Sequence, residues 1–353
     1  MSVNGTKLPE LNRIAAFFNR MPDDEPFYFL PFMELSQQDS ITLYNYLYAL
    51  KDSTKDFKTR QAEFNELFGE LLQIYTMNVY GPERIKIGEK DNSKKVCRFC
   101  ENKNSPTTFK KKAHAISEAL GNKTIVLLEE CDTCNEEFSK TIEPALIEYL
   151  SVFRTIYGIK GKGGEKQFAG KNFELKKVDE LVLKYKADDN KDDATLPMTI
   201  RMEGNNELAL QDIYKALCKY FLSVVPSEYL PVFKQTVQWI KGDVTIEKVP
   251  KIATILFNGE LALQPTLTTY IRKKADKTIP YAVGELHFAL FKYVFIVPAT
   301  SEDNISFLEQ HEYDHFWATF KHYYKIAGWG FQDFSANKKR PFGINLNITK
   351  NEK

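Results

Sequence analysis

The spacing of apolar residues in the first quarter of this 353-residue chain predicts helices. Before residue 90, apolar side chains recur every three or four positions, which is the period of an amphipathic helix. One helix is expected to begin after Ser36 and to carry Ile41, Tyr44, Leu47 and Leu50. A second is expected over residues 64–75, with Gly81-Pro82 ending it. This region offers no catalytic motif of its own.

The last half of the chain changes from helical to extended patterns. Helices are predicted over 210–224 and 227–240, and Gly242 ends the second of them. Apolar or alternating runs then predict strands over 252–257, 267–273 and 286–297. No helix of ten residues separates these strands, which favours an antiparallel sheet. The fold class predicted for the chain is therefore α+β.

Between these regions the pattern predicts a ββα unit. A first strand ends near His114, a Gly121-Asn122 turn follows, and residues 124–128 form a β-branched second strand. Residues 132–150 then show a helical stripe, and Pro144 is a possible kink. The stripe consists of Phe138, Ile142, Leu146 and Tyr149.

Two Cys-x-x-Cys motifs flank this unit. Cys97 and Cys100 form the first, and Cys131 and Cys134 form the second. Two thiolates separated by two intervening residues can reach one metal ion. Two such motifs therefore predict a closed tetrahedral zinc site with a structural role. The alternative is four unrelated thiols. The fifth cysteine, Cys218, lies in an apolar helical pattern and is interpreted as a buried core thiol.

The order of these residues resembles the HNH endonuclease family, in its variant with a four-cysteine zinc site around a ββα-metal core. The resemblance rests on His114, on Gly121-Asn122 before an apolar strand, and on Cys131-Asp132-Thr133-Cys134-Asn135. It implies that His114 is the general base that activates water, and that Asn135 helps to hold a catalytic divalent cation, usually Mg²⁺. An imidazole suits this role because it titrates near neutral pH.

Two positions depart from the family pattern. Ala113 stands where the family often has an acidic metal ligand, and Val126 stands where it often has a supporting Asn. Mg²⁺ prefers carboxylate oxygens, so a substitute acid is needed. The nearest acids in the sequence are Glu118, Glu130, Asp132 and Glu136, of which Glu118 is assigned to cofactor binding. An alternative interpretation of His114 is that it caps the strand and packs against the zinc loop.

The net charge of +1 excludes no partner, but the local charge is uneven. Residues 94–112 carry seven basic side chains and one acid, Glu101; the basic ones are Lys94, Lys95, Arg98, Lys103, Lys110, Lys111 and Lys112. Lys110, Lys111 and Lys112 adjoin His114, where a nuclease would hold DNA phosphates. The alternative is a solvated lysine face.

Other motifs favour ordinary structural readings. The glycine- and lysine-rich segment 158–166 lacks the Gly-Lys-Ser/Thr of a phosphate-binding loop and is interpreted as a flexible basic loop. The polar segment 187–193 is interpreted as an exposed loop. His311-Glu312-Tyr313-Asp314-His315 matches H-E-x-x-H, but His322 and Asp333 do not stand where a zinc protease needs its third ligand. His287 in an apolar strand is interpreted as a core histidine.

Cysteine usage and hydropathy predict the compartment. Four of the five cysteines belong to the motifs, which argues for a reducing cytosol rather than a disulfide scaffold. No leader-like segment and no run of 18 apolar residues occurs, so a soluble, cytoplasmic protein without membrane contact is expected.

The sequence predicts three regions and two functions. The regions are a helical part over 1–92, an HNH unit over 93–168, and an α+β domain of unassigned role over 169–353. The first function is a metal-dependent DNA endonuclease with structural Zn²⁺ and catalytic Mg²⁺. HNH units fused to other domains resemble bacterial restriction and phage-defence effectors, which implies a possible partner protein of a defence system. The alternative is an inactive, zinc-containing nucleic-acid-binding adaptor.

Overall fold

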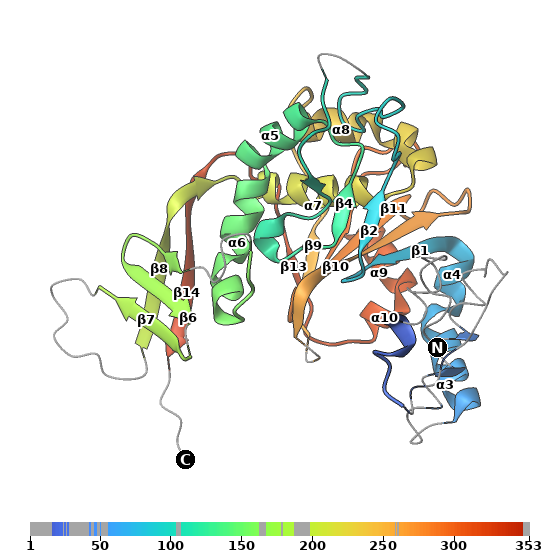
Figure 1. The fold of residues 1–353 in the computed structure, drawn as a ribbon, viewed down its shortest axis with the longest axis horizontal. Helices are drawn as coiled ribbons and strands as arrows, with labels where there is room; N and C mark the ends of the chain where they lie inside the picture. Colours follow the sequence, from blue (N-terminus) through green and yellow to red (C-terminus); the bar gives the residue numbers. More distant parts are fainter. Residues whose placement is uncertain are drawn as a thin grey trace, which may run out of the picture. The chain divides into compact units, whose positions relative to one another are not determined.

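The computed structural model divides the chain into two compact units, Met1–Leu71 and Leu72–Lys353. It describes residues 16–23, 25, 27, 42–43, 46–47, 50, 56–103, 107–161, 167–177, 179–186, 198–257, 259 and 261–348 (Figure 1). Most of the helix predicted after Ser36 lies outside these residues, as do residues 162–166 and 187–193 of the two predicted loops. The regions 93–168 and 169–353 both fall in the second unit.

The helix predicted over 64–75 ends earlier than expected. The first unit contains α3 (Phe57–Phe64), capped by Asp56, which accepts a hydrogen bond from the Thr59 amide at 2.9 Å. A π-helical turn, η1 (Asn65–Gly69), leads into α4 (Glu70–Ile74). Tyr75–Tyr80 then forms strand β1 of the second unit, so the prediction was wrong from Tyr75 onward, and Gly81-Pro82 follows a strand instead of ending the helix. Strand β1 pairs with β10, which lies almost 200 residues further along the chain.

The second unit is built on an antiparallel six-stranded sheet in the order β1-β10-β11-β12-β9-β13. Its remaining strands are β9 (Ile252–Leu256), β10 (Ala262–Arg272), β11 (Ala282–Ala289), β12 (Phe291–Ile296) and β13 (Gly330–Gln332). The predicted antiparallel sheet and α+β class are confirmed. The single strand expected over 286–297 is instead a tight hairpin, in which Phe288 pairs with Phe291. Ala289 adopts φ 55° at this turn, which an apolar pattern does not reveal.

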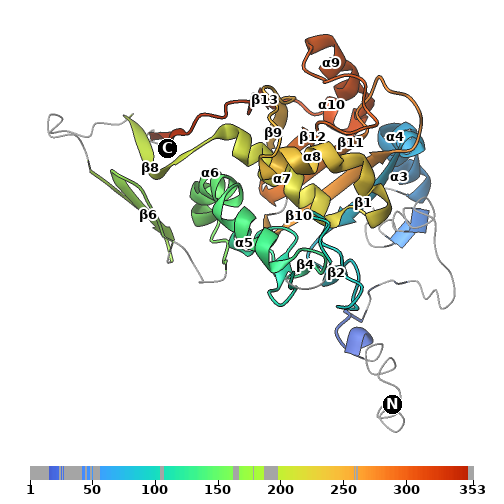
Figure 2. The ribbon, with the colours of Figure 1, turned by 90° about the horizontal axis from the view of Figure 1, so that it is seen from above.

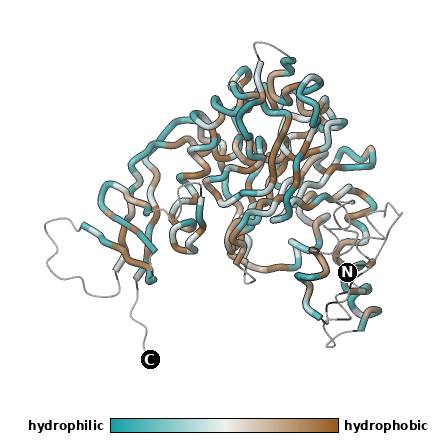
Figure 3. Tube along the Cα trace, in the orientation of Figure 1, coloured by the Kyte–Doolittle hydropathy of each residue, from teal (hydrophilic) through white to brown (hydrophobic). Residues whose placement is uncertain are grey.

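One face of this sheet is covered by α7 (Leu210–Val224), whose bounds match the prediction. Thirteen of its 15 residues are buried, because the sheet lies on one side of it and α6 on the other (Figure 2). Cys218 is fully buried here, as predicted. The predicted helix over 227–240 is a 3₁₀ segment, η3 (Ser227–Phe233), followed by α8 (Lys234–Lys241). The strands beneath are mostly brown in Figure 3, as a buried sheet requires.

The opposite face of the sheet carries polar groups under α9 (Gln310–Thr319) and α10 (Lys321–Tyr324). Tyr323 donates a hydrogen bond from its hydroxyl to Glu285 Oε2 at 2.6 Å, and Lys292 Nζ lies 3.3 Å from Glu285 Oε1. The ring of His322 contacts that of Tyr323, with ring centroids 3.9 Å apart and the ring planes tilted at 45°. Burial, together with the charge of Lys292, lowers the pKa of His322 to about 3. The folded protein therefore keeps this imidazole neutral.

This histidine should make the protein acid-sensitive. The pKa of His322 in the folded protein lies below the ordinary value of 6.5. The contribution of His322 to stability is therefore present above pH 6.5 and is lost as the pH falls below 6.5. Between pH 7.5 and pH 5 the wild type should lose on the order of 2 kcal/mol of unfolding free energy through His322. Denaturant unfolding at both pH values should show that His322→Gln lacks this loss. His315→Gln, at an exposed position of α9, should retain it; equal pH slopes in wild type and His322→Gln would contradict the assignment.

The predicted ββα unit is present with one additional strand. β3 (Ala113–His114) and β4 (Ile125–Leu127) are antiparallel, and β2 (Ile85–Ile87) joins β4 in parallel. The single helix expected over 132–150 is two helices, α5 (Asp132–Lys140) and α6 (Glu143–Ile156). Pro144 lies in the first turn of α6, where its missing N–H costs no helical hydrogen bond. Proline therefore begins a new helix instead of kinking one.

A second β-structure packs against α6. It consists of a three-stranded sheet, β5 (Phe168–Ala169), β6 (Phe173–Lys177) and β7 (Leu181–Tyr185), and a ribbon of β8 (Met198–Leu208) with β14 (Arg340–Ile348) (Figure 1). Its small core joins Val152 of α6 to apolar residues of β5, β6 and β8. The ribbon pairs segments from the two ends of the region 169–353, so local patterns did not predict it. No helix in the described part of the chain is long and apolar enough to cross a membrane.

Candidate zinc site and active site

The four motif cysteines converge on one point. Cys131 is the N-cap of α5, Cys134 lies in its first turn, and Cys97 and Cys100 come from the preceding loop. Their Sγ atoms all lie within 4.8 Å of one another, and those of Cys100 and Cys131 are 3.8 Å apart. A tetrahedral zinc ion with bonds of about 2.3 Å places its sulfur ligands about 3.8 Å apart. The four thiols are free rather than disulfide-bonded, so the arrangement fits zinc.

The electrostatics of the cluster also call for a cation. The Cys131 amide donates to Cys97 Sγ at 3.5 Å, and the Cys134 amide donates to Cys131 Sγ at 3.4 Å. A hydrogen bond from Cys134 lowers the pKa of Cys97 to about 5. Burial raises the pKa of Cys131 to about 11, and the bond to Cys97 raises that of Cys134. The negative charge of one thiolate thus makes the ionisation of the other thiols unfavourable. A bound divalent cation would supply the positive charge that stabilises four thiolates.

His114 is the last residue of β3, and its side chain lies near that of Glu118, four residues further along the chain. Its side chain is 12% exposed, and its Nε2 lies 3.7 Å from Oε2 of Glu118, which is 32% exposed. Ser117 caps the short η2 (Glu118–Leu120) by accepting a hydrogen bond from the Ala119 amide at 3.3 Å. This turn returns the chain so that the Glu118 carboxylate reaches the imidazole. The structure therefore brings together two of the predicted site residues.

Asn122 holds the connection between the two strands, a role that the sequence analysis missed. Its Nδ2 donates to the carbonyls of Ile116 and Ile125 at 2.7 and 2.9 Å. Its Oδ1 accepts from the amides of Thr124 and Ile125 at 3.1 and 2.9 Å. An Asn directly after a Gly with φ 93° was the available signal, but it was interpreted only as a turn. Asn122 thus supports the His114 loop, a function that the sequence analysis sought at Val126.

Asp132 joins the helix start to the segment that leads into His114. Its carboxylate accepts hydrogen bonds from the amides of Lys110 and Lys111 at 3.1 and 2.7 Å, and from the Thr108 hydroxyl. These bonds satisfy an acid at a helix N-terminus, where the helix dipole favours it. Two more of the four acids considered in the sequence analysis are engaged elsewhere. Glu136 pairs with Lys111 at 3.0 Å and Lys140 at 2.6 Å, and Glu130 is buried away from solvent.

Residues 97–151 match the family model described as HNH endonuclease, which covers 55 of the 353 residues. This segment is therefore similar to the HNH endonuclease family. The match begins at Cys97 and includes His114, Asn122 and Asn135, and the predicted family resemblance is confirmed. The family assigns nuclease activity to the segment in general terms. No curated protein and no solved structure matches the chain.

The remaining predicted residues of the HNH unit are accessible to solvent. Asn135 is half-buried in α5, one residue after Cys134, and its amide donates to the Cys131 carbonyl at 2.9 Å. Lys110, Lys111 and Lys112 are all exposed, and Lys111 forms the pair with Glu136. Two other basic residues of this run, Lys95 and Arg98, are buried, so they do not belong to a charged surface. The roles of these residues stay predictions.

A buried ion triad ties the HNH unit to α7. Lys219 of α7 is 1% exposed and lies 3.0 Å from Glu130 and 3.1 Å from Glu143. Burial opposes its charge, but the two carboxylates raise the pKa of Lys219. Burial raises the pKa of Glu130 to about 7. One lysine thus lies between two carboxylates, and removing it would leave the buried Glu130 without its cation.

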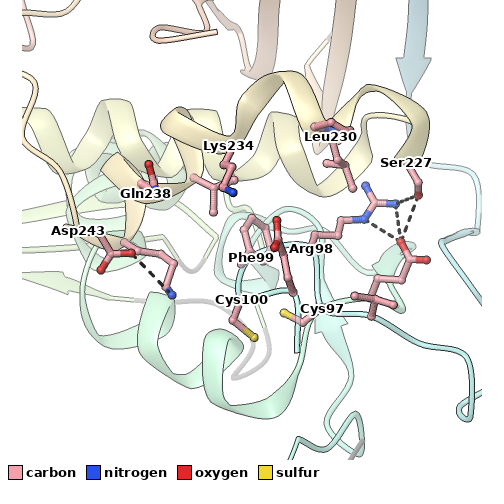
Figure 4. Close-up of a pocket in the computed structure, with 15 residues that line it drawn as sticks. Cys97, Arg98, Phe99, Cys100, Ser227, Leu230, Lys234, Gln238 and Asp243 are labelled. Atoms are coloured by element: carbon pink, nitrogen blue, oxygen red, sulfur yellow. Dashed lines mark hydrogen bonds and ion pairs between the residues drawn. The ribbon is translucent and has the colours of Figure 1, made fainter. Parts of the chain in front are cut away.

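Arg98, between the first two cysteines, makes a second connection. Its Nη1 donates to the carbonyls of Leu222 and Val225 at 3.1 and 2.7 Å, which are among the last carbonyls of α7. Its Nη2 lies 2.9 Å from Glu129 Oε2. Figure 4 shows Arg98 reaching toward Ser227 beside a pocket of about 640 Å³ between this loop and α8. The guanidinium therefore caps a helix of the C-terminal region from within the zinc loop.

The H-E-x-x-H sequence forms no metal centre among the described residues. It lies on α9, where His315 Nε2 is 3.2 Å from the Thr278 hydroxyl. The cysteine cluster is the one group of three or more metal-binding side chains found in the described segments. Asp333 accepts a hydrogen bond from the Ser335 amide at 2.8 Å instead of joining the histidines. His287 is half-buried in β11, and burial lowers its pKa.

Proposed function

We propose that this protein is a metal-dependent HNH-type DNA endonuclease that hydrolyses phosphodiester bonds. The observation that carries the proposal is the pairing of His114 with Glu118, 3.7 Å apart, in a unit that matches the HNH family. An imidazole beside a carboxylate can take a proton from water and pass it on. In this role His114 deprotonates the water that attacks a phosphodiester, and Asn122 holds the loop that positions it.

Oxygen donors for a catalytic Mg²⁺ are available, although Ala113 supplies none. Glu118 is the acid that pairs with His114, and its carboxylate is a third exposed. Asn135 adds an amide oxygen from the first turn of α5. Mg²⁺ favours such oxygens and keeps several water ligands. When bound, the ion would stabilise the charge that develops on the phosphate. Glu118 thus replaces the acid that the family often has at position 113.

The exposed lysines beside His114 suit DNA phosphates. Lys110 and Lys112 are solvent-exposed, and Lys111 is shared with Glu136. The Asp132 hydrogen bonds hold the backbone that carries Lys110 and Lys111, so these side chains stay next to β3. Phosphate contacts of this kind supply affinity without sequence preference. The lysines thus would orient the backbone across the proposed catalytic histidine.

The lysine assignment predicts a change in salt dependence. Replacing Lys110, Lys111 and Lys112 by alanine should weaken DNA binding and flatten the log–log plot of affinity against salt by about 2–3, since each lost phosphate contact contributes about 0.9. Fluorescence anisotropy with a DNA duplex at several salt concentrations measures this slope. Lys274→Ala with Lys277→Ala, at exposed positions after β10, serves as the control and should keep the wild-type slope. An unchanged slope in the triple variant would mean that the lysines are a solvated face.

A cleavage assay tests the proposal against its alternative. Purified zinc-bound protein should nick or cut plasmid DNA only when Mg²⁺ or another divalent cation is added. DNA binding without any cleavage across a series of divalent cations would support an inactive nucleic-acid-binding adaptor, which the alanine at position 113 favours.

We further propose a cytoplasmic restriction or phage-defence role, on the resemblance of HNH units fused to additional domains to such effectors. The region 169–353 would then serve as a sensor, a clamp or the contact for a partner protein. Expression in a bacterial host should lower phage plaque numbers, and a cleavage-deficient His114→Ala protein should not. Equal plaque numbers for an empty host, wild type and variant across a phage panel would contradict this role.

A further inference from the structure

A buried arginine without a partner lies on the face of α6 that looks toward the second β-structure. Arg154 is 2% exposed, and no hydrogen bond or ion pair to its guanidinium occurs among the described residues. Arginine near a helix C-terminus commonly bonds the last carbonyls. The carbonyl of Arg154 itself accepts a hydrogen bond from the Ile159 amide at 2.9 Å, but its side chain makes no such contact.

This absence is energetically unusual. A buried charge without a partner costs several kcal/mol in a typical protein, so buried arginines are nearly always paired. Burial lowers the pKa of Arg154, and no carboxylate offsets that effect. Two other buried cations behave differently: Arg98 is bonded to Glu129 and to carbonyls at the end of α7, and Lys219 lies between two acids. Arg154 therefore has no anionic partner among the described residues.

A cavity of about 280 Å³ adjoins this guanidinium. Ser151 and Arg154 line it from α6, Gln167 borders it beside β5, and Asn205 and Asn206 line it from β8. The two asparagines each use one amide proton within the protein: Asn205 Nδ2 donates to the Ala169 carbonyl at 2.9 Å, and Asn206 Nδ2 donates to Glu148 at 3.4 Å. A side-chain amide has two such protons, so both retain donor capacity. Arg154 of α6 and the two asparagines of β8 thus offer donors to one small space, whereas the Ser151 hydroxyl donates to the Ile147 carbonyl and Gln167 Nε2 donates to Glu174.

Among the described residues, Glu148 is the one acid that lines this cavity. It engages Asn206, and its Oε1 lies 2.9 Å from the position that a Cβ on Gly204 would occupy. No ion pair joins it to Arg154 in the described part of the chain, although both belong to α6. The carboxylate is therefore held against β8 and leaves the guanidinium for another anion.

We propose that this cavity binds the phosphate group of a small soluble ligand. A guanidinium binds phosphate oxygens through two parallel hydrogen bonds, and donors that converge from several directions match a tetrahedral anion better than a planar carboxylate. The volume admits one phosphate with a small attached group. A DNA duplex presents its phosphates on an outer ridge, so it cannot reach a guanidinium that is 2% exposed. The site is thus distinct from the lysines beside His114, and it does not depend on nuclease activity.

Ligand-induced stabilisation tests this site with the full-length, zinc-bound protein. Inorganic phosphate and ribose 5-phosphate should raise the thermal unfolding midpoint by about 2–5 °C at saturation, against chloride and ribose at equal ionic strength. Arg154→Met should abolish this rise. The unliganded variant should be no less stable than the wild type, because it removes an unpaired buried charge and keeps the side-chain volume. Lys184→Met, at an exposed position of β7, should respond like the wild type.

A second variant covers the case in which Arg154→Met fails to fold. Arg154→Lys keeps a cation and loses the planar fork, so calorimetric affinity for ribose 5-phosphate should fall at least tenfold. The proposal is overturned by a wild type that does not respond to either phosphate, by an undiminished response in Arg154→Met, or by an unchanged affinity in Arg154→Lys. A response to citrate that exceeds the response to phosphate would also overturn it in favour of a carboxylate site.

Discussion

Replacing His114 with alanine should reduce DNA cleavage by about 10²–10⁴-fold, the usual contribution of a positioned general base. The imidazole lies 3.7 Å from Glu118 and is only 12% exposed, so the substitution removes a side chain from a defined position at the end of β3. The Asn122 hydrogen bonds that shape the loop do not involve the His114 side chain. We therefore expect zinc content, fold and DNA affinity to stay nearly unchanged. Single-turnover cleavage rates with a saturating divalent cation measure the effect.

Two comparisons separate catalysis from structure. His311→Ala removes an exposed histidine on α9 and should cleave at the wild-type rate. Asn135→Ala should raise the metal concentration that half-maximal cleavage requires, while the rate at saturation falls less than in His114→Ala. If His114 only packs against the zinc loop, stability and activity would fall together. Wild-type cleavage by a well-folded His114→Ala protein would exclude this residue as the base.

Loss of one zinc ligand should have the largest effect on stability. Structural zinc typically contributes on the order of 10 kcal/mol or more to the folding of a small domain. Cys97→Ser should therefore release the zinc and unfold the HNH unit. The damage should extend to α7, because Arg98 in the same loop caps that helix and Glu130 beside Cys131 pairs with its Lys219. Metal analysis should find one zinc per chain in the wild type and none in the variant, and thermal unfolding should begin at a much lower temperature.

Cys218→Ala is the matched control for this substitution. Cys218 is fully buried in α7 but lies outside the metal cluster, so its loss should cost only about 1–2 kcal/mol and leave zinc binding intact. A wild-type protein purified without zinc would contradict the prediction, as would a Cys97→Ser protein with full thermal stability.

Patterns of nearby residues sufficed for the local structure. The two Cys-x-x-Cys motifs predicted the sulfur cluster because two thiols with only two residues between them must lie close together. The bounds of α7 and the left-handed Gly242 after α8 follow from helical periodicity and from the conformational freedom of glycine. His114 and its strand pairing with Val126 followed from the order of strand, turn and strand. In each case the interacting groups lie in one segment of the chain, at most 37 residues apart from Cys97 to Cys134.

The sequence by itself predicted the four-cysteine cluster, the HNH unit and the α+β class, and tertiary structure decided which charged groups lie together. Glu118, Glu130, Asp132 and Glu136 were all candidates along the chain, and Glu118 was the one assigned. Packing placed Glu118 beside His114 and gave the other three to Lys219, to backbone amides and to surface lysines. Arg98, which the sequence analysis grouped with a basic patch, binds α7, and Arg154 gave no signal at all. The partners of these charged side chains lie on separate elements, often more than 80 residues away, and desolvation depends on the whole packed fold, which no local pattern records.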